Sequence, residues 1–536
     1  MKCSGGNALV SELHAQGVEV VFGIPGTHNL SVYAALAEHG IQHVLPRHEQ
    51  GAGYAADGYA RASGRPGVCL TTTGPAVLNA AAAANQAYSD SIPVLFISPG
   101  MPVQHPGLGN GTLHEVKNQS AAMAALTARS HRVTRVEEIP AAVAQAFATM
   151  RTGRPRPVHL EIPLDLLEAD AEVEPIGVLP VPPAVPATDA VDAAAAALGQ
   201  ASTPLILVGG GASHASRQVV RTAELLGAPV LASCNGKGIV SERHPLSLGA
   251  GPQHKSAYDL VRAADVVLAV GTELSPADWW LGPPPIDGTL IRIDIDPDVI
   301  VTNAVASIPV IGDAGEALDA IVDLVNGHVD DRAEAGTESA ATWRARLRDE
   351  SSVEGEPWSQ IIGAVDDALP EDAIVAADSA MVCYYGALSN LPLHRPRSFL
   401  YPTGGGTLGY GLPAGIGAKV AQPDTPVVVL QGDGGTMFTV AELATAAQLG
   451  VSLPIVVVDN GGYGEIRNEM DDRGEAVHAV ALGHPDFVAL AESLGCRGVE
   501  VDSPSALTKA ITVAFDADRP TLLHVREDSR AAKDMW

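Results

Sequence analysis

The stretch from Val427 to Met470 constrains the fold of this 536-residue chain more than any other. It reads VVVLQGDGGTMFTVAELATAAQLGVSLPIVVVDNGGYGEIRNEM. Two β-branched apolar runs flank a helical pattern, which indicates two buried parallel strands joined by a crossover helix. Just beyond these strands stand two oxygen-bearing side chains, Asp433 and Asn460, at the sheet edge where such folds bind ligands.

An Asp and an Asn side chain with a backbone carbonyl, near Gly-rich turns, form an oxygen site suited to Mg²⁺ holding a diphosphate. The pattern resembles the GDG…N signature of thiamine-diphosphate (ThDP) enzymes. That resemblance implies Mg²⁺ ligands from Asp433, Asn460 and the Gly462 backbone oxygen. Asp459 stands where the family has a first Asn, which makes the local charge more negative. The same resemblance places further residues around the cofactor: Gly432, Gly434, Gly435 and Tyr463.

A second motif, RHEQGAGYAADGYAR at 47–61, contains Glu49 at the start of a helical pattern. On its own, Glu49 would be read as an acid that stabilises a helix N-terminus by about 0.3–1 kcal/mol. The motif resembles the ThDP-enzyme block whose Glu contacts the aminopyrimidine. By that resemblance Glu49 hydrogen-bonds the pyrimidine N1′ and favours the tautomer that deprotonates the thiazolium C2.

Two glycine-rich segments resemble the family's cofactor-cradling loops. TGPAVLN at 73–79 resembles its GPGxxN turn and supplies Gly74 and Asn79, with an Ala replacing the second Gly. YPTGGGTLGYGLP at 401–413 resembles the loop in which Gly406 offers its carbonyl to the 4′-amino group. There Leu408 would be the apolar wedge that bends the cofactor; its alternative is an ordinary core position.

The rest of the chain predicts an α/β protein of about three domains, because strand-like and helix-like runs alternate over 536 residues. The resemblance implies the three-domain ThDP-enzyme fold, each domain a parallel sheet flanked by helices. The expected domains are pyrimidine-binding (1–170), central (188–330) and diphosphate-binding (357–536). A Pro-rich linker at 172–187 separates the first two.

Composition narrows the partners. A net charge of −29 argues against nucleic acid, which needs basic surface. No run reaches the roughly 18–20 apolar residues that span a bilayer, and the N-terminus lacks a signal-peptide pattern. Five scattered cysteines fit reduced thiols in a cytoplasm. The family resemblance further implies a homodimer or homotetramer, with Glu49 of one subunit facing the Asp433 domain of another.

Two histidines are candidates for proton transfer, His28 in GIPGTH and His114 in GTLHEVKNQ. Both fall at family positions that face the thiazolium. A histidine titrates near neutrality, so it can protonate the carbanion left by CO₂ loss and release an aldehyde. Their alternative is ordinary solvated loop histidines.

The helix that follows the metal loop, by which we mean the segment of the predicted Mg²⁺ ligands Asn460 and Gly462, carries residues that indicate the class of substrate. Acetolactate synthases carry Met and Trp there, whereas this chain has Glu465 and Glu469, four residues apart on one helix face, with Ile466 beside them. If that face lines the pocket, the carboxylates favour a cationic substrate tail; otherwise they form a solvated surface. Trp279 and Trp280 could add cation–π contacts, although a structural role is the simpler reading.

The motifs LHE (113–115), GEIR (464–467) and RHEQGAG together resemble the 2-ketoarginine decarboxylases. The leading hypothesis is therefore non-oxidative decarboxylation of a 2-oxo acid through an enamine, with 5-guanidino-2-oxopentanoate as the substrate. A carboligase of the acetolactate synthase or benzaldehyde lyase type is the alternative, and a non-catalytic relative is a remote one. The middle domain lacks the Arg/Asp-rich loop of FAD-containing synthases, so FAD is a less favoured addition.

Overall fold

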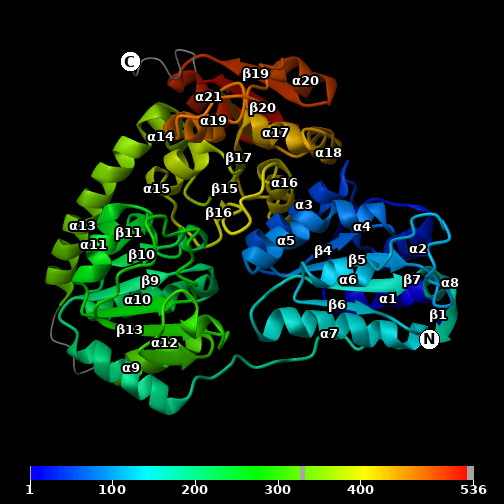
Figure 1. The fold of residues 1–536 in the computed structure, drawn as a ribbon, viewed down its shortest axis with the longest axis horizontal. Helices are drawn as coiled ribbons and strands as arrows, with labels where there is room; N and C mark the ends of the chain where they lie inside the picture. Colours follow the sequence, from blue (N-terminus) through cyan, green and yellow to red (C-terminus); the bar gives the residue numbers. More distant parts are fainter. Residues whose placement is uncertain (1, 326–331, 528–536) are drawn as a thin grey trace.

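A computed structural model describes residues 2–325 and 332–527 of the chain. Three α/β units each contain a six-stranded parallel sheet flanked by helices (Figure 1). The predicted three-domain α/β fold is confirmed. The expected end of the central domain at residue 330 and residues 528–536 of the third domain lie outside the described residues. No helix in the described part has the length and apolar character needed to cross a membrane.

The N-terminal sheet has the strand order β3-β2-β4-β5-β7-β6. Its strands are β2 (Val20–Gly23), β3 (Gln42–Val44), β4 (Gly67–Leu70), β5 (Val94–Gly100), β6 (Arg129–Arg132) and β7 (Val158–Pro163). The helices of this unit are α1 (Gly5–Ala15), α2 (Leu30–His39), α3 (Glu49–Ser63), α4 (Pro75–Asn79), α5 (Ala81–Ser89), α6 (Gln119–Ala124), α7 (Ile139–Thr152) and α8 (Leu164–Glu168). A short antiparallel pair, β1 (Lys2–Ser4) and β8 (Asp170–Glu172), closes the unit.

The C-terminal sheet repeats this connectivity, with the order β16-β15-β17-β18-β20-β19. Its strands are β15 (Ile374–Ala377), β16 (Phe399–Leu400), β17 (Val427–Gly432), β18 (Pro454–Asp459), β19 (Arg497–Val501) and β20 (Thr521–Arg526). The main helices are α14 (Ser359–Ala368), α15 (Leu388–Asn390), α16 (Gly411–Ala421), α17 (Asp433–Thr439), α18 (Glu442–Leu449), α19 (Gly464–Asp472), α20 (Phe487–Ser493) and α21 (Pro504–Phe515). A π-helical segment, Val382–Ala387, follows β15.

The central sheet differs, with the order β11-β10-β9-β12-β13-β14, which is that of dinucleotide-binding folds. Its strands are β9 (Pro204–Val208), β10 (Val230–Ala232), β11 (Ser247–Ala250), β12 (Val266–Val270), β13 (Thr289–Asp294) and β14 (Ile308–Ile311). Its helices are α9 (Thr188–Gln200), α10 (Ser216–Leu226), α11 (Lys255–Ala263) and α12 (Ala314–Val325), and α13 (Ala333–Glu354) leads to the third unit. The Pro-rich stretch 173–187 contains neither helix nor strand.

The N- and C-terminal units meet through α3 and α16, which lie side by side in Figure 1. Small residues allow this approach, because a Cβ on Gly58 or Gly417 would collide with the facing backbone. Buried Arg61 on α3 fixes the contact: its Nε lies 2.6 Å from Asp57 Oδ1 and its Nη2 2.7 Å from Asp90 Oδ2. The hydroxyl of Tyr410 donates to the same Asp57 at 2.6 Å.

Candidate active site

The predicted metal ligands come together at the carboxyl edge of the C-terminal sheet. Strands β17 and β18 are parallel neighbours, with Gly432 beside Val458, so the residues that follow them meet. Asp433 is the first residue of α17, and the Asn460 amide donates to its Oδ1 at 3.4 Å. The Asn460 Oδ1 accepts from the Gly462 amide at 3.3 Å.

This edge fits a divalent cation holding a diphosphate. The Asp433 carboxylate is buried, and no Lys, Arg or His of the described chain forms an ion pair with it. Burial and the nearby Asp459 raise the pKa of Asp433 to about 6, as expected for a buried acid that lacks a cation. The described residues contain no cluster of three His, Cys, Asp or Glu that could bind a metal, and the oxygen atoms beside Asp433 at this edge are those of Asn460 and the Gly462 carbonyl.

The glycines beside Asp433 allow the neighbouring segments to pack closely around it. A Cβ on Gly434 would lie 3.1 Å from the Tyr463 ring and 3.6 Å from the Gly462 carbonyl oxygen. One on Gly435 would press on buried Asp378. A cavity of about 280 Å³ opens beside them, lined by Asp433, Met437, Phe438, Tyr463, Leu482, Pro485 and Phe487.

Asp459, which replaces the family's Asn, braces the metal loop. It accepts hydrogen bonds from the Gly461 amide at 2.9 Å, from His484 at 3.0 Å and from His524 at 2.9 Å. Burial opposes ionisation of Asp459, but the bonds from His524 and His484 outweigh it and lower its pKa. Sequence reasoning missed both histidines; an Asp in place of an amide, which then needs extra donors, was the available signal.

The acid half of the predicted site lies on the N-terminal sheet. Glu49 is the first residue of α3 and Asn79 the last of α4. The Asn79 side-chain amide donates to Glu49 Oε2 at 2.9 Å, so the two predicted cofactor contacts touch each other. A side-chain cap from His48 to the Gln50 amide fixes the start of α3 at this point.

The structure also brings the two candidate histidines together. Their ring centroids lie 5.2 Å apart, and His28 Nδ1 lies 3.1 Å from the Thr73 hydroxyl. Burial, and then His114, lowers the pKa of His28. His114 has a φ of +63° and a buried Nδ1 without a hydrogen-bond partner. The His114 carbonyl packs on Gly74 and leaves no room for a Cβ there. Gly74 also has a φ of +70°, which favours glycine.

The loop at 401–408 is held by the N-terminal unit of its own chain. The Gly404 amide donates to Asp90 at 2.8 Å, and the Thr407 and Tyr54 hydroxyls lie 2.5 Å apart. Gly406 has a φ of +58° and is exposed, while Leu408 is half-buried. This geometry leaves the Gly406 carbonyl and the Leu408 side chain available to a ligand.

The described part of one chain shows no direct polar contact between the two halves of the predicted site. Among the described residues, no hydrogen bond or ion pair joins Glu49 or Asn79 to Asp433 or Asn460. The start of α3 instead packs on α18, where the Glu442 carboxylate accepts the Arg47 and His48 amides at 3.0 Å. Large apolar side chains beside the halves are exposed: Leu78 by 42%, Met437 by 42% and Phe438 by 51%.

The predicted substrate-pocket residues take different positions. Glu465, in the first turn of α19, accepts a hydrogen bond from the Tyr385 hydroxyl at 2.8 Å. Glu469 pairs with Arg473 at the surface, 3.0 Å away, and Ile466 is exposed. The tryptophans also divide: Trp279 is buried against Tyr258, and Trp280 is 42% exposed near Tyr385.

A larger cavity of about 520 Å³ lies at the carboxyl edge of the central sheet, between all three units. The turn after β9 lines it, and neither Gly209 in that turn nor Gly271, which faces it after β12, has room for a Cβ. Two half-buried acids, Asp278 and Asp294, also line it, and desolvation raises the pKa of Asp278 to about 6.

Comparison with known proteins agrees with this geometry. Three thiamine pyrophosphate (ThDP) enzyme family models match in order: the N-terminal TPP binding domain at 3–125, the central domain at 191–321 and the C-terminal TPP binding domain at 380–525. The chain is 40% identical to a probable 2-ketoarginine decarboxylase of Pseudomonas aeruginosa, over 98% of this chain and 94% of the relative.

Two further relatives are a probable acetolactate synthase large subunit of Methanocaldococcus jannaschii and the acetolactate synthase isozyme 2 large subunit of Escherichia coli. Each is 33% identical over 99% of this chain, covering 93% and 97% of the relative, respectively. The family matches extend across all three units, and the identity extends over almost the whole chain. The chain therefore belongs to the thiamine pyrophosphate enzyme family.

Proposed function

We propose that this protein uses ThDP and Mg²⁺ to decarboxylate 5-guanidino-2-oxopentanoate to 4-guanidinobutanal and CO₂. The observation that carries the choice of substrate is Glu465, a carboxylate three residues beyond the metal loop that Tyr385 holds in place. Such a charge suits a cationic tail and does not suit the short apolar substrate of an acetolactate synthase. The similarity to a probable 2-ketoarginine decarboxylase supports the same choice.

Bound ThDP supplies the electron sink that makes loss of CO₂ from a 2-oxo acid feasible. Asp433, Asn460 and the Gly462 carbonyl would hold Mg²⁺ and, through it, the diphosphate. Glu49, oriented by Asn79, would exchange a proton with the aminopyrimidine N1′.

The paired histidines would handle the remaining proton. Replacing the carboxyl group by hydrogen requires one proton at the former carbonyl carbon for each CO₂ released. The two rings lie against each other, with centroids 5.2 Å apart, so a proton can be relayed through the pair. We propose that this pair delivers the proton that releases the aldehyde.

Two copies of the chain would complete the site. The lack of a direct polar contact between Glu49 and Asp433 in the described part of one chain, and the exposed Leu78, Met437 and Phe438 beside them, support a homodimer or homotetramer in which the halves of different subunits meet. The five unpaired cysteines, four of them buried, are compatible with the cytoplasmic location that we propose.

We also propose that FAD takes no part. A flavin dinucleotide would bring a diphosphate into the central cavity, where the half-buried acids Asp278 and Asp294 oppose added negative charge. The purified protein is then expected to be colourless. Stoichiometric flavin absorbance would contradict this expectation.

A carboligase is the second candidate, because two relatives are acetolactate synthases and the cofactor residues would serve either reaction. Decarboxylation and carboligation differ in whether the carbon that has lost CO₂ forms its new bond to a proton or to a second carbonyl group. Purified protein with ThDP, Mg²⁺ and either 5-guanidino-2-oxopentanoate or pyruvate distinguishes them by mass spectrometry of the products. We expect 4-guanidinobutanal from the first; acetolactate from pyruvate, with no aldehyde from the first, would overturn the proposal.

A further inference from the structure

A group of carboxylates and aromatic rings surrounds Glu465, drawn from parts of the chain far apart in sequence. We call this group the acidic aromatic cage and define it as Trp280, Glu354, Tyr385 and Glu465. Trp280 comes from the loop after β12, Glu354 from the end of α13, and Tyr385 from the π-helical segment after β15. Isolated π-helical turns occur frequently at functional sites.

The aromatic part of the cage is well ordered by its own contacts. The Trp280 and Tyr385 ring centroids lie 5.9 Å apart in an edge-to-face arrangement. Behind Tyr385, Trp358 stacks on its ring at 5.9 Å, and Tyr384 packs edge-to-face at 4.6 Å. Trp280 and Tyr385 both remain partly exposed, so each can offer a ring to a ligand.

Glu354 brings a second carboxylate that the protein leaves without a full partner. Its Oε2 is buried and accepts no hydrogen bond, and the nearest base is His254, whose Nδ1 lies 3.6 Å away. Burial, followed by Glu350 and Glu465, raises the pKa of Glu354. Gly355, the residue after Glu354, packs against the Tyr385 backbone, where a Cβ on Gly355 would lie 2.8 Å from the Tyr385 carbonyl oxygen. Glu354 therefore lies beside the segment that holds Glu465.

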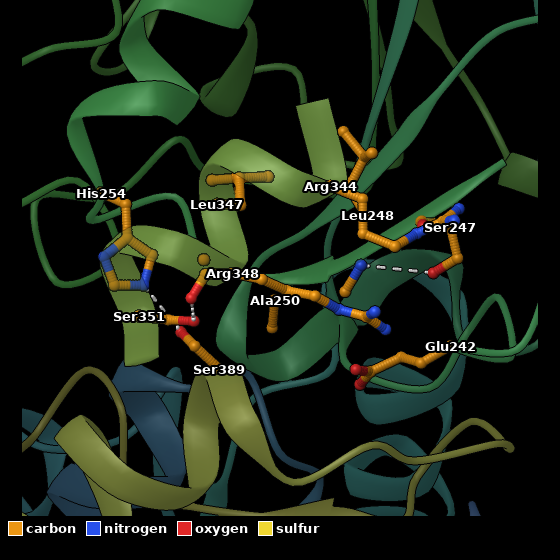
Figure 2. A pocket seen from close by; sticks show the side chains of 12 residues that line it. Glu242, Ser247, Leu248, Ala250, His254, Arg344, Leu347, Arg348, Ser351 and Ser389 are labelled. Carbon is orange, nitrogen blue, oxygen red and sulfur yellow. Dashed lines mark hydrogen bonds between the residues drawn. The ribbon is translucent and has the colours of Figure 1, made fainter. Parts of the chain in front are cut away.

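The neighbouring histidine does not supply the missing positive charge. Burial lowers the pKa of His254, so its ring is neutral at neutral pH, and its Nε2 is engaged 3.0 Å from the Ser389 hydroxyl (Figure 2). The cavity beyond it, drawn in Figure 2, measures about 30 Å³ and has room for no more than a water. No Lys or Arg in the described ranges forms an ion pair with Glu354 or Glu465.

The cage thus combines two carboxylates that lack a protein cation with rings that attract cations through their faces. A planar guanidinium suits this arrangement, because it donates up to five hydrogen bonds and stacks on aromatic rings. An aliphatic or acidic tail would leave the carboxylates desolvated and unpaired.

We propose that the acidic aromatic cage binds the guanidinium end of the substrate, with Glu465 and Glu354 as its hydrogen-bond acceptors. Trp280 and Tyr385 flank the cation, and the Tyr385 hydroxyl fixes Glu465. This inference rests on the proposed function and assigns the residues that select its substrate. Glu469, which sequence alone paired with Glu465, has a protein partner in Arg473 and lies outside the cage.

The test compares kcat/KM for 5-guanidino-2-oxopentanoate with kcat/KM for 2-oxohexanoate, whose tail is uncharged. The proteins compared are the wild type and the Glu465→Gln, Glu354→Gln and Tyr385→Phe variants. Each Gln variant should raise KM for the guanidino acid by about 10- to 100-fold, because it removes a charged hydrogen bond. The kcat/KM for 2-oxohexanoate should change by no more than about twofold. Asp472→Asn, an exposed acid on the same helix, serves as the matched control and should behave as wild type.

A binding measurement makes the test independent of turnover. Calorimetric titration with 4-guanidinobutanoate, an unreactive probe that carries the guanidinium group, should show binding about tenfold or more weaker in each Gln variant. If both Gln variants keep the wild-type preference and the wild-type Kd, the cage assignment is wrong although the proposed function stands. If the wild type itself prefers 2-oxohexanoate, the proposed function fails instead.

Discussion

The first and third units share one strand order but carry different chemistry at the same sheet edge. When the strands of each sheet are numbered in chain order, the second strand lies at one edge and the fifth lies at the other. The sixth strand lies between the fourth and the fifth. The N-terminal edge presents acid–base groups, Glu49, His28 and His114. The C-terminal edge presents the side-chain oxygen atoms of Asp433 and Asn460, the proposed Mg²⁺ ligands. One fold thus supports two tasks, because the loops after the strands carry the difference.

The comparison extends to a pair of buried histidines on equivalent strands. His159 lies on β7 between the hydroxyls of Ser98 and Ser130, at 2.8 and 2.7 Å, and burial lowers its pKa to about 3. His524 lies on β20, where bonds to Asp459 and Glu500 outweigh burial and raise its pKa. The environment of His159 in the N-terminal unit therefore favours the neutral ring. The environment of His524 in the C-terminal unit favours the protonated ring, which binds Asp459 beside Asn460.

The largest effect should come from removing the acid of the N-terminal edge. Glu49→Gln keeps the shape and the Asn79 contact but cannot exchange a proton with the pyrimidine. We expect kcat to fall by about 10²- to 10⁴-fold, with ThDP affinity within a few-fold of wild type. Steady-state kinetics and calorimetric titration measure the two quantities. A fully active variant would refute the assigned role of Glu49.

The converse loss should follow from changing the C-terminal edge. Asp433→Asn removes the charged metal ligand, so ThDP affinity in the presence of Mg²⁺ should fall by about 100-fold or more, because even outer partners of a metal contribute 10- to 100-fold. Asp471→Asn, an exposed acid on α19, is the control. Equal affinity in Asp433→Asn and this control would place the metal elsewhere.

A third change tests whether the two units depend on their buried junction. Arg61→Met leaves the carboxylates of Asp57 and Asp90 buried without their cation, which should cost about 3–5 kcal/mol of stability. Arg65→Met, just beyond the end of α3, breaks an exposed pair with Glu19 and should cost at most about 1 kcal/mol. Thermal or urea unfolding compares them; equal losses would show that the junction is not special.

The two histidines predict opposite pH responses, which are small near neutral pH. A lowered folded pKa means that His159 supports the fold fully above about pH 6.5 and loses that support as the pH falls toward 3, by up to about 1.4 kcal/mol per unit. A raised folded pKa means that His524 stabilises below about pH 6.5 and loses this as the pH rises through its folded value.

Gln variants at the two positions separate these responses. The stability difference between wild type and His159→Gln should vary with pH on the acid side, and that for His524→Gln on the alkaline side. Melting temperatures measured across the pH range provide the readout. The same direction of change for both variants would contradict the contrast between the two environments.

Sequence alone predicted β17, β18 and the residues that directly follow them, since these strands and the metal loop carry strong apolar and glycine patterns. It did not predict β6, which reads RSHR, or β16, which is two residues long, because edge strands are short and need no continuous apolar run. The family resemblance supplied the cofactor residues, and the structure places Glu49 against Asn79 and Asp433 beside Asn460.

The partners of these residues could not be predicted in the same way. His484 and His524 reach Asp459 from 25 and 65 residues away, and Tyr385 reaches Glu465 from 80. Such contacts depend on how sheets and helices pack, which no local pattern encodes. For the same reason Glu465 and Glu469 looked equivalent on one helix, although only Glu465 faces Tyr385.

In the proposed assembly, the acid edge of one chain completes the metal edge of another. Glu49→Gln and Asp433→Asn chains, carrying different affinity tags, can be co-expressed and purified as mixed dimers. Each mixed dimer then contains one wholly native site and one doubly altered site, so we predict about half of the wild-type activity. Activity no higher than that of the inactive parents would contradict the claim and place both edges of each site in a single chain.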